Sequence, residues 1–401
     1  FADRPGNNWT PNNLIAEPQL DVSQGMDVVT YTGTGSTQSI TGLDFQPDLV
    51  WIKQRNTTRN HQIVDSVRGA TKDLRSNTAT DEGTTSTGLT AFTSDGFTLG
   101  GDAGYNQSSG TYVAWCWNAG ANSDKTYTVK VVSDSGNKYR FDDFGTSAVT
   151  LDLQEGSTYV FDQSDSSNAG HPIRFGTSAN GTDYTTGVTH TGTPGSAGAK
   201  TTLVLGTGVA TLYYSCANHS GMGGQINTNS TAGASNFNGS IQATTKASTT
   251  YGFSAVSYTG NNSTSTVGHG LNAVPRWVIV KSRSADSPTG WMVKHSSLQS
   301  NYNLALNLTD TAWNPATNGW VGDLTSSTTF SLVNGSSNGN NVNQSNVTYI
   351  AYCWSEVPGF SKFDSYSGGT NPKTITTGFK PKFVIIKRTD TANYWIMIDS
   401  V

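Results

Sequence analysis

The residues with the clearest chemical meaning are a cysteine, two histidines and a methionine near the middle of the chain. Cys216, His219 and Met222 follow one another with two residues between each pair, and His171 precedes them in a separate stretch. One thiolate and two imidazoles can form a trigonal plane around copper, with a thioether as a weak axial ligand. Glycines after His219 allow the tight turn that would bring the histidine and the methionine over one metal. The sequence therefore predicts one copper site with the ligands His171, Cys216, His219 and Met222.

The stretch around these residues, 121–228, has the alternating pattern of short strands. Strands are expected at 126–131, 148–153, 155–162, 171–175 and 211–217, so that Cys216 lies at a strand end. This stretch resembles the cupredoxins, and its Cys-x-x-His-x-x-Met loop is similar to the short ligand loop of amicyanins. The resemblance implies a β-sandwich with a type 1-like copper site. Two interpretations stay open, a site that binds copper and a domain that retains the ligands for packing without metal.

A different pattern organises the rest of the chain. A proline, any residue, four apolar residues and a lysine occur at 47–53, 275–281 and 381–387. A short apolar run entered through a proline predicts a buried strand, and three copies indicate an internal repeat. A Tyr-Thr-Gly or Tyr-Ser-Gly stretch precedes each copy, and the first two copies are followed by matching Cys-Trp strands at 111–117 and 348–354.

The spacing of these copies predicts the domain organisation. The first two copies are separated by more than twice the interval between the second and third, which indicates that a small domain is inserted between them. The expected order is a connector (1–26), β repeat one (27–120), the cupredoxin-like insert (121–228), a Ser/Thr/Gly/Asn-rich linker (229–250), β repeat two (251–357) and an incomplete β repeat three (358–401).

Composition favours an all-β fold of repeated β-sandwich-like modules. Charged residues make up only 13% of the 401 residues, whereas Gly, Ser, Thr and Asn are abundant and there are ten Trp. Such a chain has many turns and enough aromatic surface to form a core. The net charge of −4 gives no reason to expect a nucleic-acid partner, and no apolar run is long enough to span a membrane.

Other chemically suggestive residues have simpler explanations. Asp65 and Arg68 are expected to form a structural ion pair, because no histidine or nucleophile is positioned with them. Cys116 and Cys353 occupy equivalent apolar strands and are expected to be buried free thiols. We find no catalytic motif and expect a protein that is not an enzyme.

The strings at 47–53, 65–69, 94–100 and 112–117 resemble a module repeated in large structural proteins of marine tailed bacteriophages, including cyanophages. The resemblance implies a virion structural protein, in a tail fibre, a tail-associated part or another surface appendage that serves assembly or host attachment. Its partners would be copies of itself, other virion proteins and a host surface glycan or protein. A secreted bacterial adhesin at the cell surface and a copper-binding electron-transfer protein are the alternatives.

Overall fold

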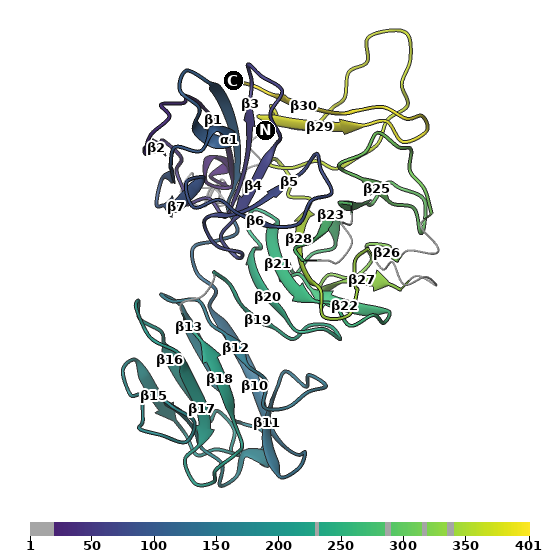
Figure 1. Ribbon diagram of the computed structural model, residues 1–401. Helices are drawn as coiled ribbons and strands as arrows, with labels where there is room; N and C mark the ends of the chain where they lie inside the picture. The colour runs from purple at the N-terminus through teal and green to yellow at the C-terminus, as the bar shows by residue number, and fades with distance from the viewer. Residues whose placement is uncertain (1–19, 229–231, 285–289, 315–318, 335–340) are drawn as a thin grey trace, which may run out of the picture.

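The computed structural model describes residues 20–228, 232–284, 290–314, 319–334 and 341–401 and is almost entirely β (Figure 1). The all-β prediction is therefore confirmed. The described residues contain one short α-helix, α1 (Ala103–Asn106), and a 3-10 turn at Val22–Gln24 precedes the first strand. No helix in these ranges has the length and apolar character needed to cross a membrane. The predicted connector lies mostly outside the described residues.

The three β repeats are called units one, two and three in chain order. Unit one follows the 3-10 turn and consists of two packed sheets. The larger has the strand order β1-β9-β3-β4-β5-β6 and the smaller the order β2-β8-β7. Its strands are β1 (Met26–Thr32), β2 (Gln38–Thr41), β3 (Leu49–Gln54), β4 (Gln62–Asp65), β5 (Lys72–Arg75), β6 (Gly83–Thr84), β7 (Leu89–Thr93), β8 (Gly96–Leu99) and β9 (Thr111–Trp117). The Pro-led string is β3, and the Cys-Trp string β9 pairs with both β1 and β3.

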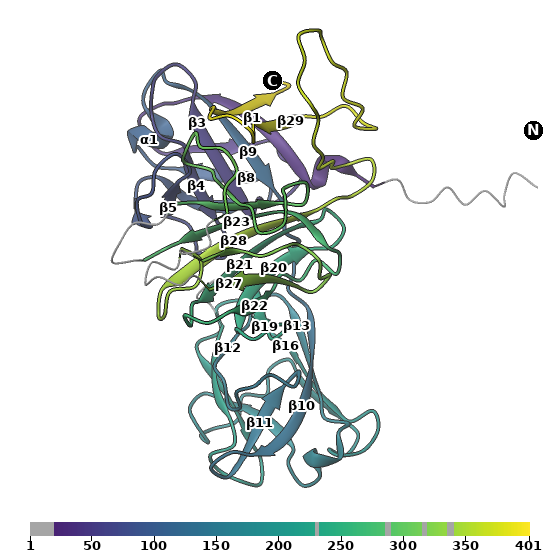
Figure 2. The same ribbon diagram turned by 90° about the vertical axis from the view of Figure 1, so that its right-hand side faces the viewer.

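The insert is a separate two-sheet sandwich at the opposite end of the molecule from unit three (Figures 1 and 2). One sheet has the order β11-β10-β13-β16-β15 and the other β12-β18-β17-β14, and residues of both form one core. Its strands are β10 (Lys125–Ser133), β11 (Asn137–Phe141), β12 (Leu151–Asp152), β13 (Thr158–Asp162), β14 (Ile173–Gly176), β15 (Val188–Thr191), β16 (Lys200–Val204), β17 (Leu212–Cys216) and β18 (Gly224–Asn227).

Unit two has the architecture of unit one. A seven-stranded sheet, β19-β20-β21-β28-β23-β24-β25, packs on a three-stranded sheet, β22-β27-β26. Its strands are β19 (Ala234–Asn236), β20 (Ala243–Ser248), β21 (Phe253–Thr259), β22 (Ser265–Gly268), β23 (Pro275–Ser282), β24 (Met292–His295), β25 (Leu304–Ala305), β26 (Trp320–Val321), β27 (Thr329–Val333) and β28 (Thr348–Ser355). Unit three, in the described residues, contributes the hairpin β29 (Phe383–Lys387) and β30 (Trp395–Asp399).

The predicted linker at 229–250 is wrong for the residues that the structure describes. β19 and β20 lie there, pair with each other, and add two strands to the unit-two sheet through β21. Their small residues are buried, which a hydropathy pattern does not reveal. Lys246 on β20 also forms a buried ion pair with Asp48 of unit one at 2.7 Å. The segment is thus part of the folded unit, with a cross-link to its neighbour.

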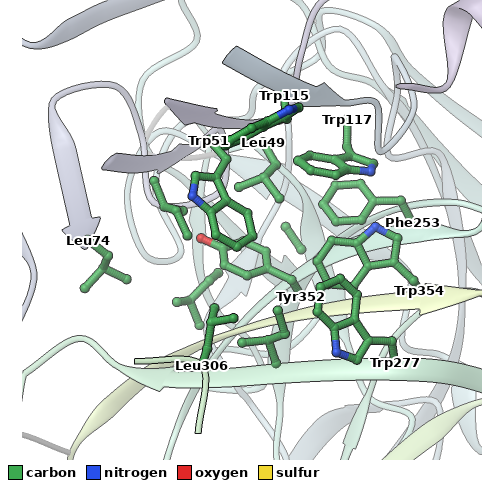
Figure 3. Close-up of a cluster of buried hydrophobic side chains, with 14 of the residues drawn as sticks. Leu49, Trp51, Leu74, Trp115, Trp117, Phe253, Trp277, Leu306, Tyr352 and Trp354 are labelled. Carbon is green, nitrogen blue, oxygen red and sulfur yellow. The ribbon is translucent and has the colours of Figure 1, made fainter. Parts of the chain in front are cut away.

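The three Pro-led strands pack against one shared hydrophobic core. Alternate residues of each strand face this core: Leu49 and Trp51 of β3, Trp277 and Ile279 of β23, and Phe383 and Ile385 of β29. Side chains alternate between the faces of a strand, so the intervening residues point to the face opposite the shared core. In unit one they enter its own second core with Phe97, and in unit two they enter a core with Phe330. Figure 3 shows the aromatic side chains of units one and two meeting in the shared core.

Equivalent positions also make equivalent polar contacts between units. The indole N–H of Trp291 in unit two donates to the carbonyl of Arg75 in unit one at 3.0 Å. Trp395 of unit three donates to the carbonyl of Ala305 in unit two at the same distance. Strand registers make Trp395 the counterpart of Trp291, and Ala305 the counterpart of Arg75. The units therefore contact each other in a repeating geometry.

A buried ion network joins units one and two beside the shared core. Arg68 pairs with Asp65 and, at 3.2 Å, with Glu82, which in turn binds Arg283 of unit two at 2.8 Å. The hydroxyl of Tyr352 donates to Asp65 at 2.6 Å. Burial opposes the charge of Arg68, but Asp65 and its other partners outweigh this effect and raise its pKa. The structure thus forms the expected Asp65–Arg68 pair and extends it across the unit interface.

We predict that Asp65→Ala will destabilise the two units by about 3–5 kcal/mol, because it leaves the buried guanidinium of Arg68 without its nearest counter-charge. Asp390→Ala, which removes an exposed surface pair with Arg388 in unit three, is the control and should leave stability unchanged. Denaturant unfolding followed by tryptophan fluorescence isolates the units, because no Trp lies between 121 and 228. Equal midpoints for the two variants would contradict the stabilising role of the network.

Candidate metal centre

Two neighbouring strands of the insert bring the candidate ligands to one end of the sandwich. β14 and β17 are antiparallel neighbours, and Ile173 lies opposite Cys216 in their register. Cys216 is therefore the last residue of one strand, and His171 stands two residues before the start of the other. The loop after Cys216 is hydrogen-bonded to β11, where the backbone N–H of Tyr139 donates to the carbonyl of Met222 at 2.9 Å. Figures 1 and 2 place β11 at the end of the insert away from the repeat units.

Three donor atoms converge at this end. Cys216 Sγ lies 3.8 Å from His171 Nδ1 and 3.5 Å from His219 Nδ1. The ligand atoms of these three residues all lie within 4.8 Å of one another. Metal bonds of about 2.0–2.3 Å at roughly trigonal angles separate donor atoms by about 3.7 Å. The spacing of the thiol and the two imidazoles therefore fits a single metal ion at their centre.

Met222, the fourth candidate, is buried with 1% exposure in the hydrophobic cluster that also contains Cys216. The structure thus brings three of the four candidate ligands into one donor group and places the fourth in the adjoining core. A metal ion held at this site would have the thiolate and the two imidazoles as its main ligands, and the thioether of Met222 would be the weak one.

The loop between Cys216 and β18 is fixed by polar contacts that the sequence did not single out. The backbone N–H of Asn218 donates to Cys216 Sγ at 3.4 Å, and its side chain donates to the carbonyl of Gly170 at 2.9 Å. On the other ligand strand, Tyr139 and Gln163 both donate to the carbonyl of His171 at 2.9 Å. These contacts hold the backbone of both ligand segments. In the sequence, only the position of Asn218 between two candidate ligands could have indicated that one of these residues contacts the site.

Solvent access and charge differ among the ligands. Cys216 is buried, His171 is half-buried and His219 is exposed. Burial, followed by the neighbouring imidazole of His219, lowers the pKa of His171. A lowered pKa favours the neutral imidazole, which is the form that binds metal. By contrast, complete burial raises the pKa of the thiols of Cys116 and Cys353. These two cysteines are buried free thiols in the sheet cores and take no part in the site.

A family model described as "Domain of unknown function (DUF7483)" matches residues 21–151 and 226–401. The match covers more than half of the chain and includes units one, two and three. All four candidate ligands lie in the intervening stretch, so the metal centre belongs to a part of the insert that the family model does not describe. No curated protein and no solved structure matches the chain.

We predict that Gly223→Ala will destabilise the insert by about 1–3 kcal/mol through overpacking. A Cβ at this position would lie 1.7 Å from the carbonyl oxygen of Tyr214, so the ligand loop has to move away from β17. Gly145→Ala is the matched control, because a Cβ there meets no atom within 4 Å. Thermal unfolding followed by hydrogen exchange of residues 121–228, which reports on the insert alone, should separate the two variants. A stable Gly223→Ala protein would refute the close loop approach.

Proposed function

The chain belongs to the DUF7483 family, and we propose that it is a structural protein of a tailed-phage virion. It would act in a tail fibre, a tail-associated part or another surface appendage that serves assembly or host attachment. The observation that carries this proposal is the shared core of the three units. Units that bury their inner faces against one another form a rigid body in which each repeat supports its neighbours, as expected of a building element.

Composition and sequence resemblance support the same proposal. The chain has few charges and many Thr, Ser, Asn and Gly residues, and its repeat strings resemble modules of virion structural proteins. The partners would then be other virion proteins and copies of this chain, and the localisation would be the extracellular particle. We infer no catalytic role for the repeat units.

The test is the presence of the protein in purified particles. Mass spectrometry of virions purified on a density gradient should recover peptides of this chain in a constant ratio to a capsid protein. Immunogold labelling with antibodies against the chain should mark one defined part of the particle. Recovery only from the host envelope fraction would instead support the alternative of a bacterial surface protein.

A second proposed function, copper binding by the insert, is supported by the converging donor atoms of His171, Cys216 and His219. The donor set and its spacing fit copper in the arrangement described above. Bound copper would supply one-electron redox chemistry. The chain's own residues would hold the ion, with the buried thiol and Met222 limiting water on one side and the exposed His219 leaving an edge open to solvent.

We predict that addition of Cu(II) will produce the intense visible charge-transfer band of a copper–thiolate bond. Cys216→Ser should abolish the band, whereas Met222→Leu should retain it and shift the reduction potential. His190→Ala is the matched control, because this imidazole bonds Thr201 on the same insert and lies outside the donor group. Affinity should fall as pH decreases, because protonated imidazoles and thiols do not bind metal. A band that persists in Cys216→Ser would exclude the proposed ligation.

A further inference from the structure

Unit three presents an open strand edge and an uncovered apolar face. In the described residues β29 pairs with β30 alone, whereas β3 and β23 are each paired on both sides. The outward residues of β30, Ile396 and Ile398, are 50% and 53% exposed. Their counterparts are all buried: Gln62 and Val64 in unit one, and Met292 and Lys294 in unit two. An apolar strand with an unpaired edge is a site for strand addition.

The two complete units show which strand occupies this place. In unit one β9 lies between β1 and β3, and in unit two β28 lies between β21 and β23. The registers are the same, with Val50 opposite Cys116 and Val278 opposite Cys353. Val384 is the equivalent residue of β29, since it follows the proline of its string by the same number of positions. The missing neighbour of β29 therefore corresponds to a Thr-Tyr-(Val/Ile)-Ala-(Trp/Tyr)-Cys-Trp strand.

The segment that would flank the added strand on its other side is residues 363–366, the equivalent of β1 and β21. Phe363 packs against the shared core, as its equivalent positions in β1 and β21 do. Tyr366, three residues later, is 51% exposed. Its counterparts Tyr31 and Tyr258 stack on the second residue of β9 and β28, with ring centroids 5.0 and 5.1 Å apart. An added strand of the same pattern would place a tyrosine on the exposed ring of Tyr366.

The polar contacts around the shared core identify a further partner. Tyr352, the fifth residue of β28, donates to Asp65 of unit one, and the equivalent Trp115 donates to Asp399 of unit three at 3.2 Å. The register makes His295 the unit-two counterpart of these two carboxylates. Unit two therefore contacts unit one, and unit one contacts unit three, through the fifth residue of this strand. By the same pattern, the residue facing His295 would belong to the corresponding strand beside β29, which is absent from the described residues. The ring of His295 lies against Phe363, at the border of the same gap.

We propose that β29 binds a β-strand of the Thr-Tyr-(Val/Ile)-Ala-Tyr-Cys-Trp type, antiparallel and in the register of β9 and β28, with its fifth residue against His295. The strand comes from a module segment other than β9 and β28, because both of these are paired on each side. Tyrosine fits the fifth position better than tryptophan. His295 Nδ1 accepts from the backbone N–H of Ser297, so the neutral ring carries its proton on Nε2. A tyrosine hydroxyl can accept a hydrogen bond from this N–H, whereas an indole N–H can only donate.

The test uses the intact chain and a synthetic peptide with the sequence of residues 346–356, with added terminal lysines for solubility. Hydrogen exchange on the unmodified protein should slow at 363–368 and 383–387 when the peptide is added. In a glutathione redox buffer that contains oxidised glutathione, the peptide cysteine should form a disulfide with the Val384→Cys protein, since directly opposed residues have Cα atoms about 4.5–5.5 Å apart. Ile385→Cys is the matched control, because its side chain points to the other face and should not react.

The fifth residue is tested in the same system. Replacing the peptide tyrosine by phenylalanine should weaken binding about 3- to 10-fold, as should a tryptophan. His295→Ala should abolish the difference between the tyrosine and phenylalanine peptides. Unchanged hydrogen exchange with the peptide would overturn the proposal, as would equal cross-linking at 384 and 385. Disulfide-linked pairs of the Val384→Cys protein in place of peptide adducts would assign the edge to a second copy and likewise overturn it.

Discussion

The fold depends on strands that are buried on both faces. Each Pro-led strand sends alternate residues into the core that the units share, and β3 and β23 send their other residues into the core of their own unit. Such a strand reads as an unbroken apolar run, and its inner face has no cover unless a neighbouring unit supplies it. This requirement makes the units interdependent. It also explains why aromatic side chains concentrate at the centre, where Trp117, Trp354 and Phe383 meet edge to face.

The insert builds most of its core from its own two sheets, and Ala234 and Phe237 of unit two complete that core. Its hydrogen bonds to unit two involve β19, where the carbonyl of Ser235 accepts from Lys125 and Tyr127, and β20, where the hydroxyl of Thr244 donates to Asp152. The ligand loop lies at the far end, bonded to β11. A site so placed is accessible to solvent and partners without any change in the shared core. Metal binding and the packing of the units can therefore vary independently, which agrees with a family match that omits the ligand residues.

The sequence revealed strands whose pattern is local and missed relations that are set by packing. The Pro-led strings, the Cys-Trp strands and the order of candidate ligands were all predictable, because strand periodicity and ligand chemistry are written in neighbouring residues. β19 and β20 were not predicted, because their many short Ala, Ser and Thr side chains give the composition of a linker although most of them are buried. The convergence of three units on one core also escaped, because repeat spacing shows that modules exist and says nothing of how they face one another. Asn218 has no pattern that marks a residue donating to a ligand sulfur.

The equivalent positions of the units show how a polar contact constrains a buried interface. Asp65 requires compensation inside the protein, and Arg68 provides it three residues later. Unit two has His295 at the position of Asp65 and Leu298 at the position of Arg68. Burial lowers the pKa of His295 and keeps the ring neutral, so no counter-charge is needed, and Leu298 packs against the shared core instead. The carboxylate and the guanidinium are thus absent together, because either one alone would leave an uncompensated charge at the unit boundary. The pair is a single electrostatic element of the repeat, and a unit can do without it only by replacing both members with groups that stay neutral.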